Sequence, residues 1–132
     1  MSDIQGGRVV GIGTDIIECV RIAQMIEKHG EMFLTRVFTA REIQYCSTRR
    51  AAKEHYAGRW AAKEAVLKVL GTGWARGILW TDIEVVNEVS GAPAIRLENR
   101  AAEIAAERGI RNVQVSISHC RAYATAFAVG TD

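Results

Sequence analysis

Residues 59–70 read Arg-Trp-Ala-Ala-Lys-Glu-Ala-Val-Leu-Lys-Val-Leu, and we expect the rest of the chain to pack around them. The stretch is rich in Ala and Leu, contains no Pro or Gly, and ends at Gly71-Thr-Gly73, a pattern typical of a helix with a glycine stop. Its apolar side chains point almost all the way round the helix, and a helix of that kind is buried. The sequence therefore predicts one long buried helix, which begins near Ala51.

The polar stripe of this helix is narrow and contains Glu64 and Lys68, one turn apart. One interpretation is an exposed Glu-to-Lys ion pair, worth about 0.3 kcal/mol. The other is that two charges on a mostly buried helix bind a partner, because unpaired buried charge is costly. A metal ion or a phosphate group would be a suitable partner, and spacing alone leaves both interpretations open.

Length and composition restrict the classes of protein that the chain can belong to. With 132 residues, one proline, no repeats and no low-complexity run, we expect a single domain spanning residues 1–132. We expect a soluble cytoplasmic protein, since no segment resembles a signal peptide or a membrane span. Three widely spaced cysteines indicate neither a disulfide framework nor a zinc site. A net charge of +2 without interleaved aromatic and basic residues does not indicate nucleic-acid binding.

The first predicted strand covers residues 9–17, which are β-branched and interrupted by glycines. Glycines within a strand indicate that the strand passes close to another element. Gly11 and Gly13 lack the third glycine and the following helix of a dinucleotide-binding fingerprint, so we exclude that function. Asp15 interrupts the apolar run, and both a turn or cap residue and a functional carboxylate fit it.

Two helices are predicted before the central one. Residues 18–29 form an amphipathic pattern closed by Gly30, and Arg21, Lys28 and nearby Arg36 give this region a basic edge. Such an edge is either solvated or docks an acidic protein. Thr39 and Glu42 match a capping box for a short helix, which a cluster of basic residues follows: Arg49, Arg50 and Lys53.

The second half of the chain predicts strands, one helix and a further candidate residue. Residues 79–86 and 94–97 read as an antiparallel hairpin, and Asn99 is expected to cap a helix that stops at Gly109. Strands over 113–118 and 122–129 follow, with His119 at the turn between them, where an imidazole can bind a ligand. The whole pattern predicts an α+β fold: an antiparallel sheet packed against one long buried helix and several shorter helices.

Three segments together resemble the holo-(acyl-carrier-protein) synthase type of 4'-phosphopantetheinyl transferase. They are Gly11-Ile-Gly-Thr-Asp15-Ile-Ile-Glu18, Arg59-Trp-Ala-Ala-Lys-Glu64-Ala-Val-Leu-Lys68 with Gly71-Thr-Gly73, and Val115-Ser-Ile-Ser-His119. The match runs from about Val9 to the end of the chain, and the length is similar to that of the short form of the family. The resemblance implies the fold of that family and transfer of the 4'-phosphopantetheine arm of coenzyme A to a serine of an apo acyl carrier protein, in support of fatty acid biosynthesis.

The resemblance also implies roles for particular residues. Asp15 and Glu64 would hold Mg²⁺, which fits the preference of a hard cation for carboxylate oxygen. Glu64, Lys68 and His119 would be catalytic, with Lys68 meeting phosphate oxygens. Coenzyme A would be bound by five residues: Lys68, Gly71, Gly73, His119 and Arg50. The general base stays open between a metal-bound water, Glu64 and the carrier itself.

The partners that the resemblance implies are coenzyme A and the apo acyl carrier protein, with no nucleic acid and no membrane. Arg21 matches a carrier-docking arginine of the family. Short members look like homotrimers with active sites shared between subunits, and the small residues of 122–128 are compatible with close sheet packing at such an interface. Two alternatives are a transferase for a polyketide or peptide synthetase carrier and a non-catalytic coenzyme A-binding module.

Overall fold

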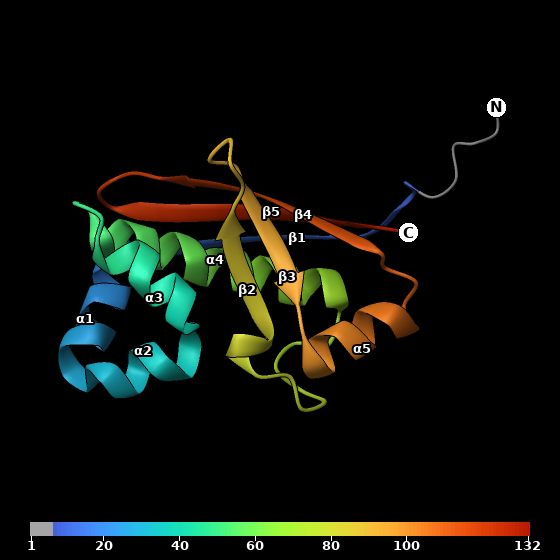
Figure 1. The fold of residues 1–132 in the computed structure, drawn as a ribbon, viewed down its shortest axis with the longest axis horizontal. Helices are drawn as coiled ribbons and strands as arrows, with labels where there is room; N and C mark the ends of the chain where they lie inside the picture. Colours follow the sequence, from blue (N-terminus) through green and yellow to red (C-terminus); the bar gives the residue numbers. More distant parts are fainter. Residues whose placement is uncertain (1–6) are drawn as a thin grey trace.

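The computed structural model describes residues 7–132, and the elements of this part of the chain follow one another as in Figure 1. They are β1 (Val9–Glu18), α1 (Cys19–His29), α2 (Glu31–Val37), α3 (Ala40–Ser47), α4 (Ala52–Leu70), the 3₁₀ turn η1 (Trp80–Asp82), β2 (Ile83–Asn87), β3 (Pro93–Leu97), α5 (Asn99–Glu107), β4 (Asn112–His119) and β5 (Tyr123–Thr131). The predicted α+β class is confirmed. No helix within residues 7–132 is long and apolar enough to cross a membrane.

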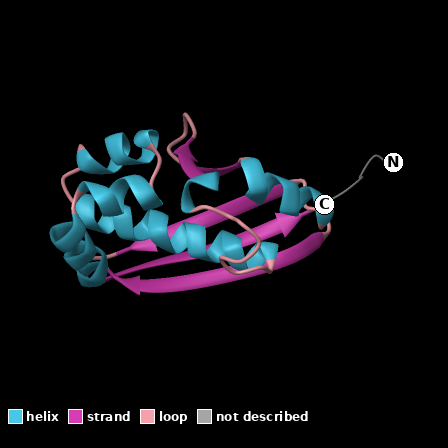
Figure 2. Ribbon diagram, turned by 90° about the horizontal axis from the view of Figure 1, so that it is seen from below, coloured by secondary structure: helices cyan, strands magenta, loops and turns pink. Residues whose placement is uncertain are grey.

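Two antiparallel sheets lie on different sides of α4. Strands β1, β5 and β4 form one sheet in that order, and β2 pairs with β3 in the other. Figure 2 shows the described helices gathered on one face of the three-stranded sheet, with α4 running along it. The opposite face of that sheet carries no helix from the described part of the chain.

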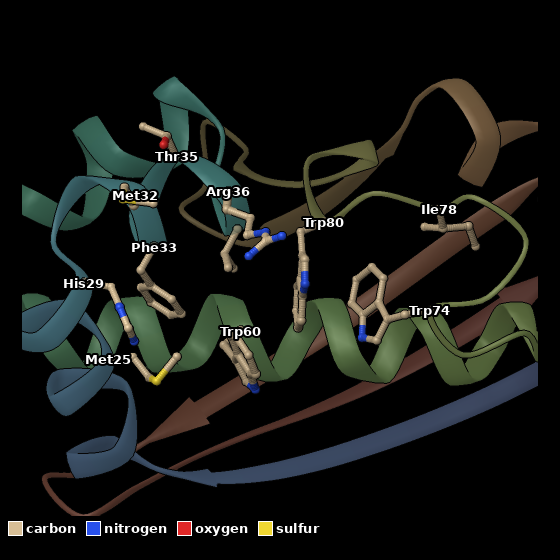
Figure 3. Close-up of a pocket in the computed structure, with 11 residues that line it drawn as sticks. Met25, His29, Met32, Phe33, Thr35, Arg36, Trp60, Trp74, Ile78 and Trp80 are labelled. Atoms are coloured by element: carbon tan, nitrogen blue, oxygen red, sulfur yellow. The ribbon is translucent and has the colours of Figure 1, made fainter.

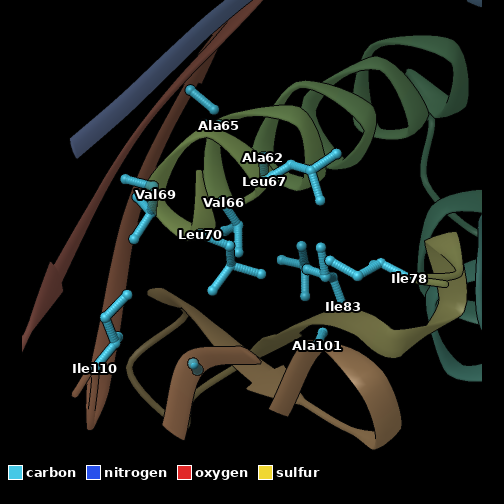
Figure 4. Close-up of a cluster of buried hydrophobic side chains, with 14 of the residues drawn as sticks. Ala62, Ala65, Val66, Leu67, Val69, Leu70, Ile78, Ile83, Ala101 and Ile110 are labelled. Carbon is cyan, nitrogen blue, oxygen red and sulfur yellow. The ribbon is translucent and has the colours of Figure 1, made fainter. Parts of the chain in front are cut away.

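The helix α4 is buried as its sequence predicts. Val66, Leu67 and Leu70 point toward Ile83 and Ala101, on the side of the small sheet and α5 (Figure 4). The helix ends at Gly71, whose φ of 77° is in the left-handed region that favours glycine. The central position of α4 follows from the apolar residues on most of its sides.

Small residues let α4 lie directly on the three-stranded sheet. A Cβ atom on Gly13 would collide with the carbonyl oxygen of Ala65, and one on Gly11 would lie 2.7 Å from the carbonyl oxygen of Val69. Residues of β5 that face the helix are also small and buried: Ala124, Ala126 and Ala128. The prediction that strand glycines mark a close approach is confirmed.

The same packing corrects the expectation that the small residues of the last strand serve a subunit interface. They are used inside the molecule, because a helix can approach a sheet closely only over small side chains. The outward face of the sheet carries larger apolar residues that are exposed: Ile12, Ile16, Tyr123 and Phe127.

Two local predictions were wrong for one shared reason, which is the buried carboxylate of Asp82. Residues 79–82 are not strand: Asp82 accepts a hydrogen bond from the amide of Leu79 at 3.0 Å, closing a turn, and the strand begins at Ile83. Asn99 does not cap α5; its φ is 51°, and its side chain donates to Asp82 at 3.2 Å. Glu98 is the N-cap instead, without a side-chain hydrogen bond.

A buried ion pair joins four elements and was not predicted. The Lys63 ammonium lies 2.9 Å from Glu42, and both side chains are fully buried. Lys63 also donates to the carbonyls of Trp80 and Ile83, while Glu42 accepts from the amide of Val85 at 2.7 Å. Burial lowers the pKa of Lys63 and the charge of Glu42 opposes that effect. The predicted capping box, in which Glu42 also accepts from the Thr39 amide, is confirmed.

Candidate active site

Three of the predicted site residues come together where β1 crosses α4. The Lys68 ammonium donates to the carbonyl of Thr14 at 2.6 Å and lies 3.7 Å from the carboxylate of Asp15. Burial raises the pKa of Asp15, and the charge of Glu64 raises it further, whereas Lys68 lowers it. Asp15 is therefore a strand residue beside two charged groups of α4, and the interpretation of Asp15 as a helix cap is wrong because α1 begins only at Cys19.

Backbone geometry explains why these three side chains meet. Glu64 and Lys68 are four residues apart on α4, so they lie on the same face of the helix. Gly13 allows the backbone of β1 to pass directly against this helix, which brings Asp15 close to that face. The ion pair that Lys68 forms is with Asp15, not with Glu64 as the simplest reading of the helix spacing implied.

The Glu64 carboxylate has a second neighbour that the sequence did not reveal. Its Oε1 atom accepts a hydrogen bond from the indole Nε1 of Trp74 at 3.1 Å. Within residues 7–132 no hydrogen-bond donor reaches the Oε2 atom of Glu64. One oxygen of the carboxylate is thus held by the protein, and the other is available to a ligand.

Asp15 and Glu64 fit a magnesium ion. The charge of Glu64 raises the pKa of Asp15, so the two carboxylates repel each other. A cation between them would relieve that repulsion. Residues 7–132 contain no group of three or more His, Cys, Asp or Glu placed to hold a metal. Magnesium is usually held by one or two carboxylates, with water and substrate phosphate completing its coordination, so this pair is a sufficient donor set.

His119 lies elsewhere in the molecule. Its Nδ1 atom is 2.8 Å from the carboxylate of Glu54, and its ring centroid is 5.0 Å from that of His55. Glu54 and Glu64 are ten residues apart on α4, which separates them by about 15 Å along the helix axis. A single subunit therefore does not bring His119 into contact with the group around Glu64, and its role in the site stays a prediction.

Basic residues gather near His119. Arg50, Lys53 and Arg121 line a cavity of about 530 Å³ together with Cys19 and Glu54. Burial lowers the pKa of His55, and the nearby charges of His119, Arg59 and Arg49 act in the same direction. Arg50 thus lies among other cations, and its contact with a phosphate group stays a prediction.

Arg59 is a candidate residue that the sequence analysis missed. Its side chain is 4% exposed, its guanidinium lies 4.1 Å from the ring centroid of Tyr45, and it donates to Asn87 at 2.6 Å. Its Nε atom has no hydrogen-bond partner within the described residues. The sequence contains one signal for it: Arg59 stands seven residues before Val66, which puts both on one face of a helix predicted to be buried.

The remaining predicted residues lie around this centre. Gly73 has a φ of 59° in the loop after α4, and a Cβ atom on Gly71 would lie 3.0 Å from the guanidinium of Arg108. Arg21 is exposed on α1, at a pocket of about 420 Å³ that Met25 and Trp60 also line. Both glycines have a conformational reason to be glycine, so their part in binding coenzyme A stays a prediction.

Comparison with known proteins identifies the family. Residues 11–128 match the family model described as the 4'-phosphopantetheinyl transferase superfamily. The chain belongs to this superfamily. A holo-[acyl-carrier-protein] synthase of Rhodopirellula baltica is 48% identical over 124 residues, which cover 94% of this chain and 98% of that protein.

Solved structures of the superfamily share the fold. The holo-[acyl-carrier-protein] synthase of Neisseria meningitidis superposes with a TM-score of 0.84 at 31% identity, covering 93% of this chain and 98% of that one. The Helicobacter pylori synthase in complex with coenzyme A superposes with a TM-score of 0.80 at 30% identity, covering 90% and 98% of the two chains. The predicted phosphopantetheinyl transferase fold is therefore confirmed.

This transferase superfamily member also has an aromatic cleft beside Glu64. The cleft measures about 810 Å³ and lies between α4 and the segment that contains α1 and α2 (Figure 3). Three tryptophans form a row in it: the ring centroids of Trp74 and Trp80 are 3.9 Å apart, and those of Trp80 and Trp60 are 4.3 Å apart. Arg36 of the predicted basic edge also lines this cleft.

Proposed function

We propose that the protein transfers the 4'-phosphopantetheine arm of coenzyme A to a serine hydroxyl of an apo acyl carrier protein, with release of adenosine 3',5'-bisphosphate, in support of fatty acid biosynthesis. The observation that carries the proposal is the meeting of Asp15, Glu64 and Lys68 at the crossing of β1 and α4. The names of the relatives and the coenzyme A bound to one structural neighbour support the same reaction. We place it in the cytoplasm, since both substrates are soluble there.

In this proposal Asp15 and Glu64 hold one magnesium ion. When bound, the ion neutralises phosphate charge and polarises the phosphoryl group that the serine attacks. The free Oε2 atom of Glu64 and the carboxylate of Asp15 supply its protein ligands. The Trp74 indole retains the other oxygen of Glu64.

Lys68 binds the phosphate that departs. Its ammonium is anchored by the carbonyl of Thr14, and its side chain is 54% exposed, so it has both a fixed base and access to a ligand. Negative charge on the leaving bisphosphate increases as the bond to it breaks. A fixed ammonium therefore stabilises the transition state more than it stabilises bound coenzyme A.

The protein acts as a homotrimer with shared sites in this proposal. Two features support it. His119 pairs with Glu54, which lies about 15 Å from Glu64 along α4, so one subunit does not bring His119 and Glu64 together. The outward face of the large sheet also exposes apolar residues. His119 and Arg50 of the partner subunit would then bind the 3'-phosphate of a coenzyme A whose pyrophosphate lies at Asp15 and Glu64. Burial of that face gives the assembly its stability.

The proposed reaction is tested by mass spectrometry of an apo carrier protein incubated with coenzyme A. The carrier should gain the phosphopantetheine arm only when magnesium is present. Asp15→Asn and Glu64→Gln, which keep shape and remove charge, should each slow transfer at least about 100-fold. Glu107→Gln, which removes an exposed carboxylate paired with Arg76, serves as the control. Transfer at a normal rate by both site variants, or without magnesium, contradicts the proposal.

A further inference from the structure

The Trp74 indole is a fixed hydrogen-bond donor to Glu64, one of the two carboxylates of the proposed metal site. The indole Nε1 donates to Oε1 of Glu64 at 3.1 Å, from a loop that follows α4 and into the same face as Lys68. Both residues are half-buried, so the hydrogen bond is partly shielded from water. A neutral donor orients a carboxylate and leaves its charge in place.

The position of the Trp74 ring is itself fixed by neighbours. Its ring packs on Trp80, and Trp80 stacks on Trp60, which stands four residues before Glu64 on α4 (Figure 3). Trp60 in turn stacks on Phe33 of α2, with centroids 6.0 Å apart. The backbone of Trp80 is also held, because its carbonyl accepts from the buried ammonium of Lys63 at 3.1 Å.

This row of rings begins and ends on α4. It leaves the helix at Trp60, passes through Trp80 and returns at Glu64 through the indole of Trp74. A donor held in this way restricts the rotamer of a flexible Glu side chain before any ligand arrives. The Oε1 atom of Glu64 is engaged by Trp74, which leaves Oε2 for a cation.

We propose that Trp74 is a positioning residue that orients the Glu64 carboxylate for a divalent cation. The inference rests on the proposed function, because it takes Glu64 as a cation ligand. Hydrogen bonds to metal-binding carboxylates typically account for about 10-fold to 100-fold in metal affinity. The gain arises because the carboxylate is ordered in advance and keeps only one direction in which to bind.

The test measures the affinity of the full-length protein for Mn²⁺, followed by the electron paramagnetic resonance signal of the free ion, with Mg²⁺ as competitor. Two variants at position 74 remove the N–H group. Trp74→Phe keeps an aromatic ring, and replacement by benzothienylalanine keeps the size of the indole with sulfur in place of N–H. Each should weaken cation binding about 10-fold or more, with an unchanged circular dichroism spectrum.

A double-variant cycle separates positioning from a general effect on the loop. If Trp74 acts through Glu64, Trp74→Phe should cause no further loss of Mn²⁺ affinity in the Glu64→Gln background. Losses that add in full, or an unchanged affinity in the benzothienylalanine variant, overturn the inference. If Glu64→Gln alone leaves Mn²⁺ affinity unchanged, the proposed metal site itself is wrong, so the two failures are distinguishable.

Discussion

At the scale of single residues, the chemistry of the site depends on how neighbours hold each charged group. Lys68 is anchored by the carbonyl of Thr14 and attracted by Asp15, while Glu64 is held by an indole. Charged groups fixed in this way do not need to reorganise during a reaction, which is what makes them effective in stabilising developing charge.

Replacement of Lys68 should show whether its ammonium acts in catalysis or only in binding coenzyme A. We expect Lys68→Ala to lower kcat by a larger factor than it raises KM for coenzyme A, because the ammonium stabilises charge that grows only as the phosphate leaves. Steady-state kinetics with coenzyme A as the varied substrate provides the measurement. Weaker coenzyme A binding at full turnover would show that Lys68 only binds substrate.

His55 should make the stability of the protein depend on pH. Burial is the main reason that the pKa of His55 is below the ordinary 6.5. The groups around His55 are Tyr45 of α3, His119 of β4, and Glu54 and Arg59 of its own helix. Between its folded pKa and 6.5 the unfolded chain binds more protons. The contribution of His55 is thus complete above about pH 6.5 and is lost as pH falls through the folded pKa.

The variant His55→Gln should therefore lose less stability than the parent protein between pH 7 and pH 5. Urea unfolding at several pH values gives the free energies of unfolding. His29→Gln, in which the replaced histidine lies on α1, is the matched control and should retain the parental dependence on pH. Identical pH profiles for the parent and the His55 variant would refute the assignment.

At the scale of elements, the contact between β1 and α4 builds the site. This contact requires glycine in the strand, because a side chain at Gly13 would occupy the space of the Ala65 carbonyl. Asp15 is two residues further along the same strand and faces the same helix, so any separation of the two elements moves it away from Glu64.

Gly13→Ala is the sharpest test of this arrangement. Forcing a methyl group into a packed interface of backbone atoms should destabilise the protein by about 1–3 kcal/mol. Transfer should fall more than the unfolded fraction explains, since the Asp15 and Glu64 carboxylates move apart. Thermal unfolding and the carrier assay, both at a temperature where the variant is folded, give the two quantities. Full activity in a stable variant would contradict the model of the site.

The prediction about the protein partner concerns helix α1. Arg21 is exposed beside a pocket lined by Met25 and Trp60, and carrier proteins of this class are expected to be acidic. We expect Arg21→Glu to raise KM for the carrier strongly, to leave KM for coenzyme A nearly unchanged and to flatten the dependence of rate on salt. The reason is that exposed charges act on encounter over a Debye length of about 8 Å.

A matched charge reversal keeps this prediction specific. Arg8→Glu reverses an exposed cation that pairs with Asp132 at the end of the chain, away from α1. It should leave KM for the carrier unchanged at both low and high salt. An equal effect of the two variants would mean that total charge, and not docking at α1, controls the reaction.

At the scale of the whole molecule, the large sheet is covered by helices on one face only (Figure 2). Its outward face exposes Ile12, Ile16, Tyr123 and Phe127, all of them large apolar side chains. Contiguous exposed apolar residues mark interaction surfaces. The proposed trimer gives this face a partner and places His119 of the partner subunit near Glu64.

Mixing inactive variants tests the shared site directly. Glu64→Gln and His119→Ala subunits should each be nearly inactive alone. After joint refolding, mixed trimers should regain transfer, because an intact Glu64 of one subunit meets an intact His119 of its partner. Sedimentation velocity measures the assembly, and the carrier assay measures the activity. A trimer without regained activity would contradict the shared site.

Much of the fold and part of the site could be predicted from local sequence. The apolar pattern of residues 59–70, the glycine stop at Gly71 and the capping box at Thr39 predicted elements that are present, since each depends on residues within one or two helical turns. The resemblance selected Asp15, Glu64 and Lys68, which the structure brings together.

Contacts between distant segments were decided by the tertiary structure alone. Three such contacts leave no periodic signal in the sequence: the ion pair of Lys63 with Glu42, the hydrogen bond from Trp74 to Glu64, and the hydrogen bond from Asn99 to Asp82. The sequence also does not show that His119 lies far from Glu64 within one subunit. Local sequence determined which elements form, because propensity and capping act over a few residues. Only packing decided which side chains meet, because burial forces each polar group to find a partner wherever the fold places one.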